Sequence, residues 1–158
     1  MVRKLIAWAA MIAAALPAAA VGLQSLAAAA GSVVGANPQW AAAPVNITEA
    51  AAMRDQATVV RLMDRGVDAH ARYELRKDLV FDEPATMTPF EAAIATERAE
   101  VASLMLWNGY RIDDPGEWRQ LRCLAQLEDN SEIGALLDTV KPAGAVLECS
   151  GVIRPWTR

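Results

Sequence analysis

The sequence predicts an all-α fold, in which about three helix pairs stack in a row, an extended β-hairpin is inserted, and an apolar segment precedes the first pair. Two observations predict the stack: apolar residues recur at helical spacing between residues 45 and 140, and a glycine closes two of the copies at the same distance. A third observation, that no charged residue lies between positions 5 and 48, sets the N-terminal segment apart. We therefore divide the chain into residues 1–30, a linker at 31–44, repeats at 45–140 and a tail at 141–158.

The first 30 residues have the composition of a signal peptide or of an N-terminal membrane anchor. Arg3 and Lys4 precede the almost wholly apolar run of residues 5–23, and small residues follow it. This order fits a secretory signal cleaved after Ala20 or Ala30, and a proline at position 17 favours that interpretation because it would interrupt a spanning helix. The same 19 residues are also about long enough to cross a bilayer uncleaved.

Both interpretations carry the rest of the chain out of the cytoplasm, because the two basic residues favour a cytoplasmic N-terminus. We therefore expect an exported protein, periplasmic or otherwise extracytoplasmic, which residues 5–23 anchor in the inner membrane if they are not removed. The alternative, an alanine-rich helix in a soluble core, would leave about 40 residues without a polar face.

The remainder of the chain is acidic. The whole chain has a net charge of -4, and since the first 44 residues contribute +2, the other residues carry -6. Acidic and basic residues are interspersed, so they give no basic face for a phosphate backbone. We therefore do not expect nucleic acid as a partner.

Each repeated unit has the pattern of two short helices followed by a turn. In the second unit Thr88 and Pro89 predict a helix start, since a hydroxyl caps the helix and proline is tolerated in its first turn. Gly66 and Gly109 follow the second helices of the first two units and predict left-handed C-caps. The apolar faces comprise Ile47, Ala50, Ala51, Val59, Leu62 and Met63 in the first unit, Phe90, Ala93, Ile94, Val101, Leu104 and Met105 in the second, and Leu124, Ala125, Ile133, Leu136 and Leu137 in a weaker third. The third unit has no capping glycine, as expected of a terminal repeat.

Two motifs give these units a family resemblance. Thr88-Pro89-Phe90-Glu91-Ala92-Ala93 is similar to the opening T-P-L-H-x-A-A of ankyrin repeats, with a glutamate in place of histidine. Residues 62–68 and 105–110 are similar to the closing L-L-x-x-G-A-D of that family. Residues 45–140 thus resemble ankyrin repeats, which implies a helical stack that binds a protein partner without catalysis. The alternatives are an unrelated helical bundle and, for the whole chain, a single-span accessory or structural subunit of a membrane complex.

The first two units stand further apart than ankyrin repeats do. Gly66 and Gly109 are 43 residues apart, whereas the ankyrin period is 33 residues. The additional residues lie between Val67 and Met87, where apolar residues alternate on both sides of a polar run at 76–78. This pattern predicts an extended two-stranded finger.

The finger is the preferred candidate for a partner-binding surface, because a loop longer than its repeat requires is more often functional. Tyr73, Arg76 and Phe81 supply the aromatic and arginine side chains that dominate interface energies. Tyr110 and Trp118, which follow the second capping glycine, form a second candidate group. In the alternative interpretation the apolar finger residues only cover the outer helix, and the second group belongs to a turn.

Nothing in the sequence predicts catalysis or a cofactor. It contains no nucleophile elbow, Walker loop, dinucleotide fingerprint or H-E-x-x-H motif, and its single histidine, His70, has no second ligand at metal-binding spacing. Asp113 and Asp114 are more typical of a turn than of a cation site. A hydrolase would need a pocket that brings His70 together with Glu91 or Asp113.

Two features near the C-terminus leave alternatives open. Cys123 and Cys149 can pair in an oxidising compartment, but Cys123 also fits a helix pattern as a small buried residue. The tail either caps the last repeat or is an exposed interaction segment, and the burial of Trp156 distinguishes the two.

Overall fold

The computed structural model describes residues 43–156, which form six helices and one two-stranded sheet. In chain order the elements are α2 (Ile47–Ala52), α3 (Gln56–Asp64), β1 (Tyr73–Leu75), β2 (Ala85–Met87), α4 (Pro89–Ala95), α5 (Ala99–Trp107), α6 (Pro115–Leu127) and α7 (Ser131–Thr139). The predicted mostly helical fold with a small β-hairpin is therefore confirmed. The signal peptide or anchor predicted at 1–30 and nearly all of the linker lie outside the described residues. Between residues 43 and 156, no helix has the length and apolar composition needed to cross a membrane.

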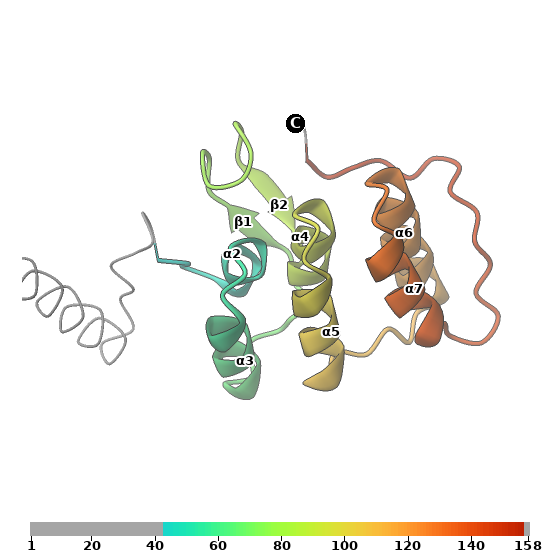
Figure 1. The fold of residues 1–158 in the computed structure, drawn as a ribbon, viewed down its shortest axis with the longest axis horizontal. Coiled ribbons are helices and arrows are strands. Elements are labelled where there is room, and N and C mark those ends of the chain that lie inside the picture. Colours follow the sequence, from blue (N-terminus) through green and yellow to red (C-terminus); the bar gives the residue numbers. More distant parts are fainter. Residues whose placement is uncertain (1–42, 157–158) are drawn as a thin grey trace, which may run out of the picture. The chain divides into compact units, whose positions relative to one another are not determined.

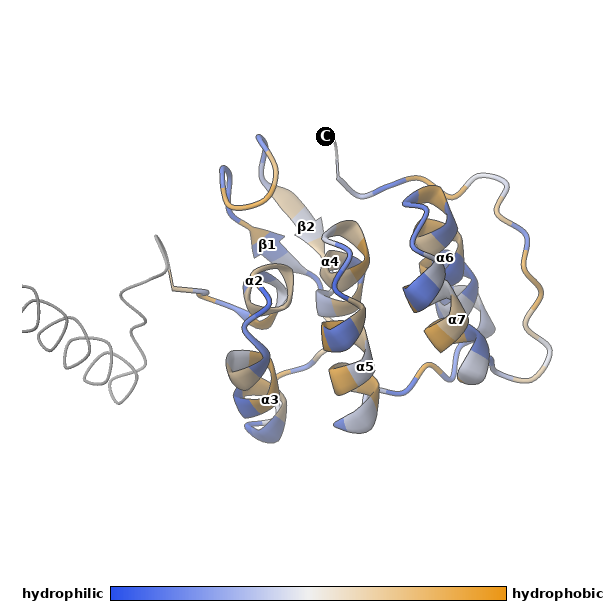
Figure 2. Ribbon diagram, in the orientation of Figure 1, coloured by the Kyte–Doolittle hydropathy of each residue, from blue (hydrophilic) through white to orange (hydrophobic). Residues whose placement is uncertain are grey.

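The helices form three successive hairpins, α2 with α3, α4 with α5, and α6 with α7 (Figure 1). The first helices make one row, in which α4 packs against both α2 and α6, and the second helices make another, in which α5 packs against both α3 and α7. The longer helices carry both hydrophobic and hydrophilic residues (Figure 2), and their hydrophobic residues join one buried cluster. A continuous core therefore runs through all three hairpins.

One turn geometry joins the two helices of every hairpin. The residue just past the first helix's C-cap is left-handed each time, with φ values of 64° at Arg54, 58° at Glu97 and 55° at Asp129. The next residue donates its backbone N–H to a carbonyl five positions back, Asp55 to Ala50, Arg98 to Ala93 and Asn130 to Ala125, each at 2.8 Å. The three hairpins are thus copies in backbone geometry.

Glycines end α3 and α5 as the sequence predicts. Gly66 and Gly109 have φ values of 79° and 95°, and the residue after each donates its N–H to a carbonyl five positions back, as Val67 does to Leu62 at 3.1 Å. At either glycine, no atom lies within 4 Å of the place where a Cβ would stand. Glycine is therefore required by the backbone conformation and not by crowding.

Helices α2 and α4 are buried along their whole length, and each contains three alanines. Each begins with a side-chain cap, in which the Asn46 or Thr88 oxygen accepts the backbone N–H of the residue three positions on. That residue is Glu49 in α2 and Glu91 in α4, and packing buries both carboxylates. A buried carboxylate needs a charged or hydrogen-bonding partner, so these two positions determine how the finger attaches.

The predicted finger is present, but its strands differ from the predicted ones. Strands β1 and β2 pair antiparallel from Tyr73 opposite Met87 to Leu75 opposite Ala85, so the connecting loop spans residues 76–84. Phe81, expected on the returning strand, lies in this loop. The loop folds back because Asp78 adopts a left-handed conformation and donates its N–H to the Phe81 carbonyl at 2.9 Å, which places the ring in the core.

The tail returns from α7 across the end of the stack towards the finger (Figure 1). Cys123 of α6 and Cys149 of the tail form a disulfide, so the paired alternative is the one the structure has. The Trp156 ring is only 3% exposed and stacks on Phe81 with 6.2 Å between ring centroids. This burial shows that the end of the tail packs on the finger loop rather than extending as an exposed segment, while the disulfide holds the tail to α6 of the last hairpin.

Candidate partner-binding surface

Three of the five residues predicted to bind a partner lie in the core. Phe81, Tyr110 and Trp118 are 6%, 3% and 1% exposed, so none of them presents a surface to a docking protein. The Trp118 indole N–H donates to the Leu137 carbonyl of α7 at 2.8 Å, which ties the third hairpin together. The sequence interpretation is corrected here, because large aromatic side chains that interrupt a polar segment were needed to fill gaps between hairpins.

Tyr73 and Arg76 lie at the surface but are engaged within the chain. The Tyr73 hydroxyl donates to the Asp68 carbonyl at 2.9 Å. Arg76 binds Glu49 through two hydrogen bonds, Nε to Oε1 at 2.6 Å and Nη2 to Oε2 at 2.7 Å. Arg76 therefore fixes the finger to the first hairpin, and Tyr73 fixes it to the segment that follows α3. The role of both residues in partner binding stays a prediction.

The Arg76 pair makes ionisation of Glu49 favourable inside the protein. Burial opposes the charged form, but the Arg76 hydrogen bond, the backbone N–H groups of Val45 and Arg76 and the guanidinium charge outweigh it. The pKa of Glu49 consequently lies below its usual value of 4.5. The hydrogen bond to Glu49 in turn raises the pKa of Arg76, so this pair stays charged over the physiological range.

A second buried carboxylate, Glu91, is held in the same way one hairpin later. Arg72 reaches it from the finger with 3.2 Å between Nη1 and Oε1, and Gln120 of α6 donates to the same oxygen at 2.7 Å. The Thr88 N–H donates to Oε2 at 2.8 Å. The other Arg72 nitrogen, Nη2, donates to the Thr86 carbonyl at 2.7 Å, so the arginine is fixed while 43% of its side chain is exposed.

A third glutamate, Glu117 at the start of α6, joins the same surface. The Tyr110 hydroxyl and the His70 Nδ1 lie 2.7 and 3.1 Å from its Oε1. The Tyr110 ring stacks with two other rings, that of His70 with 4.1 Å between ring centroids and that of Phe90 with 5.2 Å. Burial first, and then the hydrogen bond to Glu117, raise the pKa of the Tyr110 hydroxyl far above its usual range, so it remains a donor.

These groups line one polar groove of about 500 Å³, which we call the finger groove. Its lining comprises His70, Arg72, Thr88, Glu91, Asp114, Gly116, Glu117, Arg119, Gln120 and Leu121. The finger, the start of α4 and the first half of α6 each contribute to it. Sequence reasoning named two of these positions, His70 and Glu91, but only as what a hydrolase pocket would require. It did not select the others, because no spacing pattern in the sequence joins Arg72 to residues so far along the chain.

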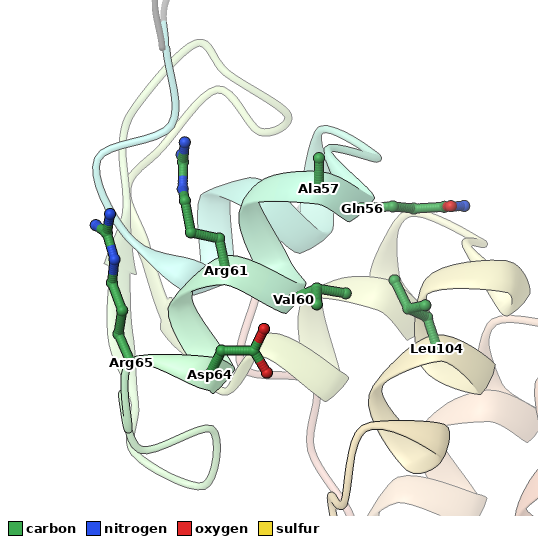
Figure 3. Close-up of a pocket in the computed structure, with 7 residues that line it drawn as sticks. All are labelled: Gln56, Ala57, Val60, Arg61, Asp64, Arg65 and Leu104. Carbon is green, nitrogen blue, oxygen red and sulfur yellow. The ribbon is translucent and has the colours of Figure 1, made fainter. Parts of the chain in front are cut away.

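A second groove lies on the opposite row of helices, between α3 and α5, and has a volume of about 590 Å³. Val60 of α3 and Leu104 of α5 form its apolar part, and Arg61, Asp64 and Arg65 stand along one side (Figure 3). We call it the outer groove. Its side chains come from two helices only, and the structure gives few hydrogen bonds that fix them.

Two arrangements could indicate chemistry: a hydrolase pocket that contains His70 and Glu91, and a metal site. His70 and Glu91 do line the same groove, but His70 is placed on Glu117, while both Glu91 oxygens accept hydrogen bonds from the chain itself. Within residues 43–156 no group of three or more His, Cys, Asp or Glu side chains could hold a metal ion. No protein-family model, curated protein or solved structure matches the chain.

Proposed function

We propose that this chain is an exported ankyrin-type repeat protein that binds a partner protein, without catalysis, through the finger groove. The observation that carries the proposal is that the finger, the second helix pair and the third helix pair together build the groove, and that internal hydrogen bonds fix the exposed side chains of Arg72 and His70 in it. Fixed side chains lose little conformational freedom when a partner docks, which is the condition for an effective interface. Arginine, histidine and carboxylate groups in one groove suit the mixed polar surface of a folded protein.

The ankyrin-type assignment is supported by the repetition of one hairpin. Helix order, packing in two rows and the left-handed turn residue recur in all three units, and the motif Thr88-Pro89 opens the second unit as it does in ankyrin repeats. In such repeats the first-helix face and the finger form the binding side, and the finger groove lies on that side here.

Export is supported by two independent features. The N-terminal segment has the pattern of a signal or an anchor. The Cys123–Cys149 disulfide suits an oxidising compartment, because disulfides are rare in the cytosol of most organisms. If residues 5–23 are retained, the same data fit the alternative, a single-span accessory subunit whose groove contacts a neighbour in a membrane complex.

Binding is favoured over hydrolysis because the groove's potential acid and base groups are used within the fold. Glu91 accepts from Arg72, Gln120 and Thr88, and its side chain is 2% exposed, so it has no free oxygen to receive a substrate proton. The hydroxyl oxygen of Thr88 accepts the Glu91 N–H as a helix cap and is not set beside a base.

Site-specific photo-cross-linking in the full chain tests the proposal. A cross-linking residue replaces Arg119 in the finger groove or, as the matched control, Arg65 in the outer groove, since both arginines are exposed. We expect a protein adduct of defined mass from position 119 only, formed in the host's own envelope. The charge reversal Arg119→Glu should then reduce the yield of that partner at least tenfold in co-purification, whereas Arg65→Glu should leave it unchanged.

Each other result contradicts a defined part of the proposal. An adduct from position 65 alone would move the site to the outer groove. Absence of any protein adduct at both positions, in cells where the chain is intact and exported, would reject partner binding through either groove. Intact mass of the mature chain, measured alongside, separates a cleaved signal from a retained anchor.

A further inference from the structure

The C-terminal tail is attached to the helices by side chains and not by its backbone. Within residues 141–156 the backbone–backbone hydrogen bonds, from Ala145 to Pro142 and from Val152 to Cys149, join the tail only to itself. No helix or strand forms in this segment. The tail therefore depends on a small number of point attachments to stay in place.

Besides Lys141, whose ammonium nitrogen lies 5.1 Å from the centre of the Trp118 ring, and the buried Ala145, three attachments hold the tail from Cys149 onwards. The first is the disulfide from Cys149 to Cys123 of α6. The second is Arg154, which forms an ion pair with the buried Glu128 and donates to the Leu127 carbonyl at 2.6 Å. The third is the stacking of Trp156 on Phe81 of the finger loop. The disulfide is the strongest of the three and lies before the other two along the chain.

The two sulfurs of the disulfide differ in their accessibility. Cys123 is completely buried in α6, whereas Cys149 is partly exposed. Val146 and Leu147 on one side and Ile153 on the other are exposed, and the N–H groups of residues 146–148 make no backbone hydrogen bond within residues 43–156. Cys149 is therefore the cysteine of the pair that lies on the accessible side of the bond, in a segment with no regular secondary structure, whereas Cys123 is closed to a nucleophile.

We propose that the Cys123–Cys149 disulfide is a redox latch on the tail, which a dithiol opens by attack on the Cys149 sulfur. The thiolate of the dithiol forms a mixed disulfide with Cys149, and the Cys123 sulfur leaves as a thiolate and takes up a proton. The second thiol of the dithiol then attacks the mixed disulfide and releases Cys149. Two electrons and two protons pass to the protein, and the dithiol becomes a disulfide.

Release of the latch has a defined structural consequence. Without the covalent bond, the Arg154 pair and the Trp156 stack must hold a segment that has no structure of its own, and both lie near the chain end. When they separate, Phe81 loses its cover, and the buried Glu128 at the end of α6 loses its arginine. The helical rows do not pass through the tail, so they keep their packing. Reduction thus converts a closed cap into an apolar surface beside the finger loop.

The test uses the oxidised full-length chain and dithiothreitol, followed by reoxidation. The indole N–H signal of Trp156, assigned by its loss in Trp156→Phe, reports whether its ring still lies on Phe81. Far-ultraviolet circular dichroism reports the helices. We expect reduction to shift the Trp156 signal to the position of an exposed indole, to raise the fluorescence of an added apolar dye at least threefold and to leave the helical signal within a tenth of its starting value. Reoxidation should reverse all three changes.

A second arm tests where the dithiol attacks. A thiol–disulfide exchange protein that retains only its attacking cysteine forms a stable mixed disulfide, and peptide mapping locates it. We expect the adduct on Cys149, since Cys123 is buried. The proposal is overturned if the reduced chain keeps the Trp156 signal unchanged, if the helices melt in the same step, or if the adduct forms on Cys123. Because no partner protein takes part, failure here leaves the proposed partner binding untouched.

Discussion

The finger and the tail both run outside the helical rows, and the chain secures them by different chemistry. The finger is held by charge: Arg76 on Glu49 and Arg72 on Glu91, each carboxylate buried at the third position of a first-row helix. The tail is held mainly by a covalent bond and an aromatic stack, Cys149 on Cys123 and Trp156 on Phe81, and it has one ion pair besides, Arg154 on the buried Glu128. Phe81 is the point where the two segments meet.

This difference determines which solution conditions act on each segment. An ion pair with a buried carboxylate weakens when acid protonates the carboxylate, and it is indifferent to thiols. A disulfide is broken by thiols and does not titrate. The finger should therefore respond to pH and not to thiols, whereas the tail should respond to thiols and, through the Arg154–Glu128 pair alone, to acid. The following predictions separate the two responses.

The largest effect is expected from Arg76→Ala. The substitution leaves the buried Glu49 carboxylate without the guanidinium, with only the backbone N–H groups of Val45 and of residue 76 as hydrogen-bond donors. Breaking such a pair costs about 3 kcal/mol in the free energy of unfolding, near the lower end of the range because the guanidinium is partly solvated. Urea denaturation followed by circular dichroism measures it. Arg65→Ala, an exposed arginine of the same hairpin, is the control and should change the free energy by less than about 0.5 kcal/mol.

The double substitution Cys123→Ala with Cys149→Ala acts on the other segment. The disulfide joins positions 26 residues apart, and loss of that loop constraint lowers the free energy of unfolding by about 3 kcal/mol. Wild-type protein in dithiothreitol should match the variant, and Arg76→Ala should lose stability in dithiothreitol by the same amount as wild type. A strongly non-additive result would show that finger and tail are coupled through Phe81 rather than independent.

Arg72→Ala should have a smaller effect than Arg76→Ala, although both remove an arginine from a buried glutamate. Glu91 keeps the Gln120 amide and the Thr88 N–H as partners after the substitution. We expect a loss of roughly 1.5 to 2 kcal/mol, the lower part of the range for one hydrogen bond to a charged group. An Arg72→Ala loss equal to that of Arg76→Ala in the same urea series would show that Gln120 and Thr88 do not compensate.

Sequence reasoning predicted the helices and capping glycines because these depend on local spacing. Gly66 and Gly109 are set by backbone conformation alone, and the apolar faces are set by the helical period. The turn residues Arg54, Glu97 and Asp129 were not predicted, since non-glycine residues adopt the left-handed conformation uncommonly and their side chains give no signal for it in the sequence. Local spacing is therefore enough to predict the helices, but not the conformation of the turns that join the two helices of each hairpin.

The candidate surface was predicted poorly for a related reason. Aromatic residues in a polar segment are typical of interfaces, but they are equally typical of the positions that seal gaps between repeats, and burial distinguishes the two only in three dimensions. Tyr110 and Trp118 seal such gaps. The groove depends instead on pairs such as Arg72 with Glu91 and His70 with Glu117, which are 19 and 47 residues apart. Separations that large leave no periodic signal.

The smallest effect near neutral pH is expected in the slope of unfolding free energy against pH, because the contribution of Glu49 to that free energy changes with pH only in acid. Its pKa is lower in the folded chain than its usual value of 4.5, so the unfolded chain binds this proton more readily. The stabilisation is thus fully present above pH 4.5 and is lost as the pH falls through the folded pKa. Glu49→Gln removes the titrating group, so the slope of unfolding free energy against pH below 4.5 should be shallower in the variant than in wild type. Asp138→Asn, at an exposed pair with Arg122, is the control. If Asp138→Asn reduced the slope of unfolding free energy against pH more than Glu49→Gln does, the acid sensitivity would lie outside the finger.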